Sequence, residues 1–164
     1  MIPESFHADT NALPWAENWA DDPNISLQLL MADVEGARFA VRMRFTPGTL
    51  VFPHKHTGEV HVYTYSGSWS YLEYPDSPAN VAGSYLFEPP GSTHQLKVAD
   101  DADGLTDVLF VIYGALLHLD NEGALLAVTD AESVLEEYPR RLREQGKKVP
   151  DRVPVGGSMR YKAL

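Results

Sequence analysis

The sequence predicts an all-β protein, a barrel or sandwich of short strands with one helix near the end of the chain. Hydrophobic runs are short, alternate with polar residues and are rich in β-branched and aromatic side chains, which is typical of half-buried strands. A helical period appears only after residue 129. The length of 164 residues suits one domain with its own core, and we expect a single domain over residues 1–164.

The expected strands lie between residues 25 and 128, which we take as the barrel core. Pairs and triplets of turn-forming residues separate them, at Pro47-Gly48, Pro75-Asp76, Pro89-Pro90-Gly91 and Asn121-Glu122-Gly123. The last of these favours a hairpin between its two neighbouring strands. The expected strands are Ile25–Met31, Ala37–Phe45, Thr49–Pro53, Val60–Tyr65, Ser68–Tyr74, Gly83–Phe87, His94–Val98, Thr106–Tyr113, Ala115–Leu119 and Ala124–Val128.

The helix and an irregular tail are expected over residues 130–164. Thr129 or Asp130 can cap the helix, and an acidic residue follows in its first turn. Pro139 should kink or interrupt it, because proline removes a backbone donor. After Gly146 the chain is rich in proline and glycine. The residues of the expected apolar stripe are Val134, Leu135, Tyr138 and Leu142.

Charge and composition exclude several classes of partner. The net charge of −10 disfavours binding to nucleic acid or to anionic membranes. The basic residues at 140–143 and 147–148 are interpreted as a solvated helix face. No run approaches the length of a membrane span, and no leader peptide is expected. The absence of cysteine excludes disulfides and thiolate ligands and fits a cytoplasmic protein.

A cluster of histidines points to a metal site. His54 and His56 are two positions apart, so in a strand both imidazoles project from the same face. Neutral imidazole is a common ligand of Zn, Fe, Ni and Cu. Two histidines on a surface could also lack any function, so the pair alone leaves both interpretations open. His7 needs no function, and His118 is interpreted as structural or as lying at the edge of a pocket.

Two longer patterns favour the metal site. The first runs from Gly48 through His54-Lys55-His56 and His61 to Gly67, and the second runs from Gly83 through Pro89-Pro90-Gly91 to His94. They resemble the two motifs of the cupin family, G-x5-HxH-x3,4-E-x6-G and G-x5-PxG-x2-H-x3-N. The resemblance implies a single jelly-roll-like cupin barrel with a short C-terminal helix. It also implies that His54, His56 and His94 bind the metal.

The chain departs from the cupin motifs in ways that leave a fourth ligand open. His61 stands where the family has a carboxylate, the second glycine comes one residue early, and Val98 replaces the final asparagine. His61 is therefore one candidate. Glu73 is the other, because it shares strand parity with the aromatic residues before it. Two further carboxylates, Glu88 and Glu59, are candidates to hydrogen-bond a ligand histidine or a bound water.

A closer resemblance narrows the expected chemistry. The chain is similar to the 2,4'-dihydroxyacetophenone dioxygenase group of cupins and, more loosely, to acetylacetone-cleaving enzyme. The segments that carry the similarity are Asn11–Trp15, Arg44–Gly48, His54–His61, Gly67–Trp69, Glu73–Tyr74 and Tyr85–His94. The resemblance implies an Fe(II) enzyme that uses O2 to split a C–C bond beside a carbonyl, in a hydroxyketone or β-dicarbonyl substrate. It also implies a homodimer.

Aromatic residues near the motifs are candidates for a substrate pocket, although each could equally serve the core. These are Tyr63, Trp69, Tyr71 and Phe87. The alternative function is a Zn- or Ni-binding cupin that acts as a sensor, a small-ligand binder or a Lewis-acid isomerase or hydrolase, because one fold hosts many functions.

Overall fold

The structure is a computed structural model that describes residues 2–3, 5–151, 153 and 161–162. Its helical elements are the 3₁₀ turn η1 (Trp19–Asp21) and the helix α1 (Ala131–Glu144). Its strands are β1 (Ile2–Pro3), β2 (Ala16–Glu17), β3 (Ile25–Asp33), β4 (Arg38–Phe45), β5 (His54–His56), β6 (Val60–Ser66), β7 (Ser68–Tyr71), β8 (Asn80–Val81), β9 (Tyr85–Glu88), β10 (Thr93–His94), β11 (Leu96–Val98), β12 (Thr106–Tyr113), β13 (Leu116–Leu119), β14 (Leu125–Thr129) and β15 (Tyr161–Lys162).

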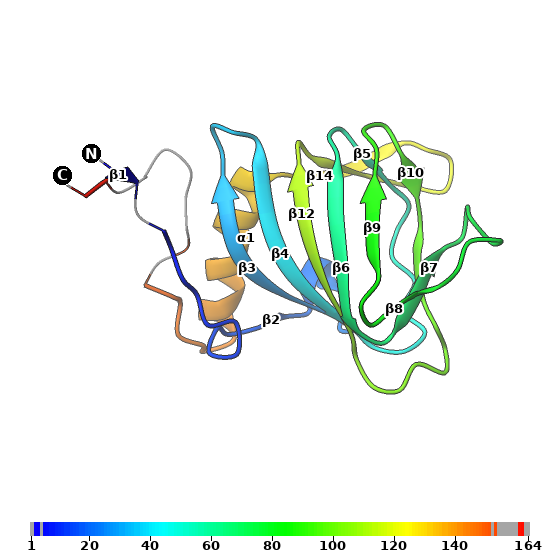
Figure 1. The fold of residues 1–164 in the computed structure, drawn as a ribbon, viewed down its shortest axis with the longest axis horizontal. Helices are drawn as coiled ribbons and strands as arrows, with labels where there is room; N and C mark the ends of the chain where they lie inside the picture. The colour runs from blue at the N-terminus through cyan, green and yellow to red at the C-terminus, as the bar shows by residue number, and fades with distance from the viewer. Residues whose placement is uncertain (1, 4, 152, 154–160, 163–164) are drawn as a thin grey trace.

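Curved antiparallel sheets enclose the core. The order is β2-β3-β4-β12-β6-β9 in a six-stranded sheet, β10-β5-β13-β14 in a four-stranded sheet and β11-β7-β8 in a three-stranded sheet. The strands β3, β4, β12, β6 and β9 lie side by side in Figure 1, with β5 and β10 at the far end of this row. The strands β1 and β15 pair separately, near the two ends of the chain. The prediction of a mostly β fold with one late helix is confirmed.

Alternation along the strands decides which side chains enter the barrel. In β6, Val60 and Val62 are buried, whereas Tyr63 and Tyr65 are exposed. In β4 the same alternation buries Phe39, Val41 and Phe45. These inward side chains form one hydrophobic cluster with those of β3, β7, β11 and β12. Burial of this apolar surface is the main force that closes the barrel.

Helix α1 covers one flank of the barrel, against β3 (Figure 1). The Asp130 carboxylate accepts a hydrogen bond from Ser133 N, and the Ser133 hydroxyl accepts one from Asp130 N. Together the two bonds form a capping box. Pro139 lies inside the helix and does not end it, so of the two expected effects, a kink or an interruption, the interruption does not occur. Buried Tyr138, whose hydroxyl donates to Pro14 O at 2.6 Å, helps hold the helix in place despite the missing donor. Among the described residues, no helix is long and apolar enough to cross a membrane.

Two other expectations differ from the structure. The strand expected at Thr49–Pro53 is reduced to one bridge, between Leu50 and Lys97, and the strand proper begins at His54. Pro53 explains this, because it has no N–H with which to continue a ladder. The tail beyond Gly146 was expected to be irregular throughout, but β15 pairs with β1. The rest of that expectation, at residues 152, 154–160 and 163–164, lies outside the described residues.

Gly67 joins β6 to β7 at a position that only glycine fits. Its φ is +81°, and a Cβ there would lie 2.1 Å from Thr106 Oγ1 and 2.5 Å from Thr106 Cα. Gly83 has φ +87°, but a Cβ there would meet nothing within 4 Å. We therefore expect Gly67→Ala to lower the free energy of unfolding by about 1–3 kcal/mol more than Gly83→Ala, because only the first adds a clash to the left-handed strain.

Urea unfolding of the two variants measures this difference, since the glycines share the same backbone conformation. Equal destabilisation would mean that β7 shifts freely away from Thr106, and the close approach would then carry no stability.

Candidate metal centre

Three buried histidines meet at one point inside the barrel. His54 and His56 come from β5, and His94 comes from the neighbouring strand β10, where it pairs directly with His54. Their ring centroids lie 4.8–5.1 Å apart. One nitrogen of each ring lies within 4.8 Å of the others, and the residues are exposed by only 6%, 2% and 1%. This group can bind a divalent metal ion.

The hydrogen bond that His54 makes leaves its other ring nitrogen free to face such an ion. His54 Nδ1 lies 3.0 Å from Phe52 O, so Nδ1 carries the proton and donates it to this carbonyl. The other ring nitrogen, Nε2, is then unprotonated and has a lone pair for a metal ion. Burial, together with the nearby His56 and His94, lowers the pKa of His54 to about 3. Its imidazole is therefore neutral at physiological pH, which is the form that binds metals.

A fourth group, the carboxylate of Glu88, faces the same point. Glu88 Oε2 lies 2.8 Å from His56 Nε2 and 3.2 Å from His94 Nε2, and the residue is 3% exposed. Burial alone would raise the pKa of Glu88, but the interactions with the two imidazoles outweigh it and lower the pKa to about 2. Oε2 is thus an ionised acceptor in the metal-free protein.

The contacts between these groups do not satisfy them. Glu88 Oε2 lies close to both His56 Nε2 and His94 Nε2, but neither contact has hydrogen-bond geometry. Among the described residues, Glu88 Oε2 and His94 Nε2 therefore have no hydrogen-bond partner. His56 Nδ1 is also buried without a partner. Unsatisfied buried polar atoms are costly and rare in proteins. A divalent cation between the imidazole nitrogens and Oε2 would satisfy several of them at once, so the residues present fit a metal ion.

Tyr71 holds Glu88 and His94 in place. Its hydroxyl donates to Glu88 Oε1 at 2.5 Å, and its ring stacks on His94 with centroids 3.7 Å apart. Burial and the charge of Glu88 raise the pKa of Tyr71 well above its usual value, so the hydroxyl stays protonated and remains a donor. Outer hydrogen bonds of this kind orient metal ligands.

A mainly apolar cavity of about 100 Å³ adjoins the histidines. Its polar lining comes from His54, His56, Tyr71, His118 and Thr129. A cavity of this size holds a ligand of only a few heavy atoms, because about 150 Å³ of apolar cavity accommodates benzene. The apolar part of the wall comes mainly from Ile25, Leu27, Phe39, Val41, Met43, Phe45, Leu96, Phe110, Ile112 and Leu116.

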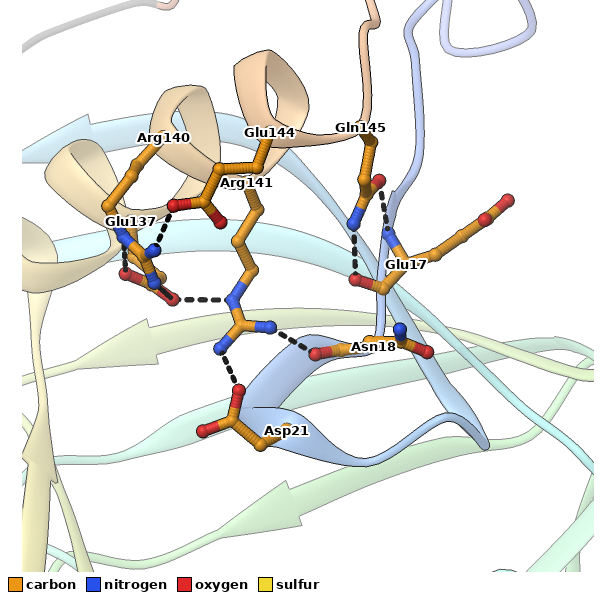
Figure 2. Close-up of polar contacts among 8 residues, drawn as sticks. All are labelled: Glu17, Asn18, Asp21, Glu137, Arg140, Arg141, Glu144 and Gln145. Atoms are coloured by element: carbon orange, nitrogen blue, oxygen red, sulfur yellow. Dashed lines mark hydrogen bonds and ion pairs between the residues drawn. The ribbon is translucent and has the colours of Figure 1, made fainter.

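A strained turn forms another part of the cavity wall. Trp19 and Ala20 of η1 line the cavity, and Asn18, Ala20 and Asp21 have φ of 53–60° without being glycine. Such strain persists only where the surroundings hold it. Figure 2 shows the restraint: the Arg141 guanidinium of α1 donates to Asn18 O and, at 2.8 Å, to Asp21 Oδ1. Helix α1 therefore fixes this side of the cavity.

The sequence of the chain agrees with this geometry. The profile of the ChrR cupin-like domain family matches residues 3–117, which is more than half of the chain. The chain belongs to this cupin family. No curated protein matches the chain.

Solved cupin structures extend the comparison. A protein of unknown function with a cupin-like fold from Ralstonia eutropha JMP134 is 33% identical, with a TM-score of 0.85 over 96% of this chain and 95% of that one. A putative acetylacetone dioxygenase from Methylibium petroleiphilum PM1 is 15% identical (TM-score 0.74; 82% and 94% covered). An acetylacetone dioxygenase from Acinetobacter johnsonii is 17% identical (TM-score 0.66; 82% and 90% covered). The last two similarities concern the fold.

Both expected candidates for a fourth ligand lie elsewhere in this cupin. His61 is in β6 between two buried valines, so it faces outward, where Tyr85 Oη lies 2.8 Å from its Nδ1. Glu73 is exposed in the turn after β7 and accepts from Gln95 N at 2.9 Å. The strand ends at Tyr71, so the parity that was expected to bring Glu73 inward does not reach it. Glu59 is exposed beside His61, away from the buried group.

The expected pocket aromatics also divide. Tyr71 lines the cavity, as expected. Tyr63 and Phe87 are 42% and 46% exposed on the outer face of the sheet, which corrects their assignment to the pocket. Trp69 is buried in the core, where its Nε1 donates to Thr64 Oγ1 at 3.0 Å, and it does not line the cavity. The structure adds Thr129 to the cavity and places His118 beside it.

Proposed function

We propose that this cupin is an Fe(II)-dependent dioxygenase that splits a C–C bond beside a carbonyl in a small hydroxyketone or β-dicarbonyl compound. The observation that carries the proposal is that two of the three grouped histidines, His54 and His56, line a mainly apolar cavity. A storage or structural ion needs no such cavity, whereas a substrate that binds an ion needs space beside it. The fold shared with acetylacetone dioxygenases and the resemblance to 2,4'-dihydroxyacetophenone dioxygenase support the same chemistry.

The residues divide into ligands and supporting groups. His54, His56 and His94 would hold the ion through the nitrogens that face one another. A bound Fe(II) with three protein ligands supplies open coordination positions for a chelating carbonyl substrate and O2. Glu88 Oε2 faces the same point, where its negative charge would offset part of the charge of the ion. Tyr71 keeps this carboxylate in position through Oε1.

The apolar cavity wall has its own role. It surrounds the space beside His54 and His56 with hydrocarbon, and a substrate that fills this space would strengthen the electrostatic interactions there by displacing water. Its size limits the ligand to a compact molecule. The aromatic and aliphatic side chains that line it would contact the hydrocarbon part of the substrate.

A second candidate function rests on Glu88. If its Oε2 binds the ion together with the three imidazoles, the protein supplies four ligands, which is the number of a closed tetrahedral zinc site. The protein would then be a zinc-binding cupin that senses or stores the ion, or one that binds a small ligand without oxidising it.

Oxygen uptake tests the proposal. Protein loaded with Fe(II) under nitrogen is mixed with oxygenated buffer and acetylacetone or a series of small hydroxyketones. We expect O2 consumption in step with loss of the ketone and release of a carboxylic acid. The same protein loaded with Zn should consume none. An iron-loaded protein that consumes no O2 with any of these compounds, yet retains zinc tightly, would reject the dioxygenase and favour the second candidate.

A further inference from the structure

The cavity beside the histidines contains a second polar group, formed by His118 of β13 and Thr129 at the end of β14. His118 Nε2 lies 2.8 Å from Thr129 Oγ1, and both residues line the cavity. Neither belongs to the three-histidine group. Apart from the groups already described around that centre, the cavity wall is hydrocarbon. This pair therefore provides a polar contact outside the metal ligands.

The position of the pair follows from the strand register. His118 pairs directly with His54 across β13 and β5. Directly paired residues on neighbouring antiparallel strands have Cβ atoms about 5 Å apart and project from the same face. His118 therefore lies next to the candidate ligand His54. Its strand β13 lies between β5 and β14 in the sheet. The pair and the ligands His54 and His56 thus border the same small cavity.

The pair keeps hydrogen-bonding capacity after its internal bond is made. Between them, a neutral imidazole and a hydroxyl have two donors and three acceptor lone pairs, and their mutual bond uses only one of each. Both residues line the cavity, so these remaining donor and acceptor positions are available to a ligand that enters it. In apolar pockets, a few such groups fix the orientation of a ligand and select it.

We propose that His118 and Thr129 form a subsite for a hydroxyl group that the ligand carries outside its two chelating oxygens. The inference rests on the proposed function, because the ion anchors the other end of the ligand. Together with the small cavity, it defines the ligand class as a compact ketone with a hydroxyl beyond the chelating pair. Thr129 and His118 are thereby specificity-determining residues.

Calorimetric titration of the Zn-loaded protein tests this without turnover. The probes are 1,3-dihydroxyacetone and hydroxyacetone, which differ by one hydroxyl. We expect the wild type to bind 1,3-dihydroxyacetone about tenfold more tightly, which corresponds to one satisfied hydrogen bond. Thr129→Val keeps the shape of the side chain and should bring the ratio close to one, whereas Thr129→Ser should restore it.

Thr64→Val is the matched control, because Thr64 is a buried threonine that accepts from Trp69 and does not line the cavity. It should leave the ratio unchanged whatever it does to stability. A ratio near one in the wild type, or a ratio that Thr129→Val leaves intact, would overturn the subsite and make the pair a strut between β13 and β14. Failure of the proposed function is separate: it shows as absence of O2 uptake by the Fe(II)-loaded protein, while the zinc titration is unaffected.

Discussion

Replacing His94 with alanine is expected to weaken binding of the divalent ion by more than about 100-fold. Loss of a residue that only supports a ligand typically costs 10–100-fold in affinity, and loss of a ligand should exceed this. His94 is one of three imidazoles that meet within 4.8 Å, so two ligands would remain. His54→Ala should have the same effect. Elemental analysis and competition with a chromophoric chelator measure the stoichiometry and the affinity.

His61→Ala is the control that separates the buried group from the histidine content of the chain. His61 belongs to the first motif, but it faces outward beside Tyr85. We expect this variant to bind the ion like the wild type. Undiminished binding in His94→Ala would contradict the three-histidine site and with it the proposed chemistry. Loss of the ion in His61→Ala would show that the metal lies on the outer face of β6.

The second large effect is expected for Glu88→Gln, which keeps the size of the side chain but removes its charge. The carboxylate lies 2.8 Å from His56 Nε2 and is buried. Water and salt would therefore screen its attraction for a cation at this point only weakly. We expect a 10–100-fold loss of affinity for the ion. The Tyr71 bond can persist to the amide oxygen, which limits structural change.

Glu59→Gln removes an equal charge from an exposed position and should leave the affinity unchanged. Chelator competition on both variants provides the comparison, and circular dichroism verifies that each is folded. If Glu88→Gln binds the ion as tightly as the wild type, Glu88 neither ligates the metal nor compensates its charge, and the zinc alternative with four protein ligands loses its support.

The sequence predicted the parts of the site that depend on local geometry. The two-residue spacing of His54 and His56 placed both on one face of a strand, and the second motif supplied His94. Alternation also predicted most strands, because each buries one face. The fold class followed from the same pattern and is confirmed by the match to the cupin family.

What the sequence could not determine was which face of certain strands turns inward. In β6, aliphatic and aromatic side chains alternate, so either set could form the core. The structure buries Val60 and Val62, and this choice turns His61 and Tyr63 outward. Val60 of β6 pairs with Glu88 of the neighbouring strand β9. Glu88 therefore faces inward like Val60, whereas Phe87 faces outward. A charged residue inside a barrel contradicts the usual pattern, and the reason for it lies in groups from other strands, the Tyr71 hydroxyl and the imidazoles of His56 and His94.

Strand ends were the other source of error. Glu73 would have faced the interior if β7 had continued for two more residues. The ladder with β11 stops at Tyr71, opposite Leu96, because the chain turns there. Such an end depends on which partner strand is present, and that partner lies more than twenty residues further along the chain.

The direct pairing of His94 with His54 bears on how the protein would acquire a metal ion. Two residues forty positions apart become neighbours through the backbone pairing of β5 and β10. Small zinc domains differ, because their unfolded chains collapse around the metal. Because backbone pairing already brings two of the three imidazoles together, we expect the barrel to form before an ion binds. The ion that enters is then set by metal supply and by the rigidity of a finished cage, so the conditions of expression decide which metal a purified sample contains.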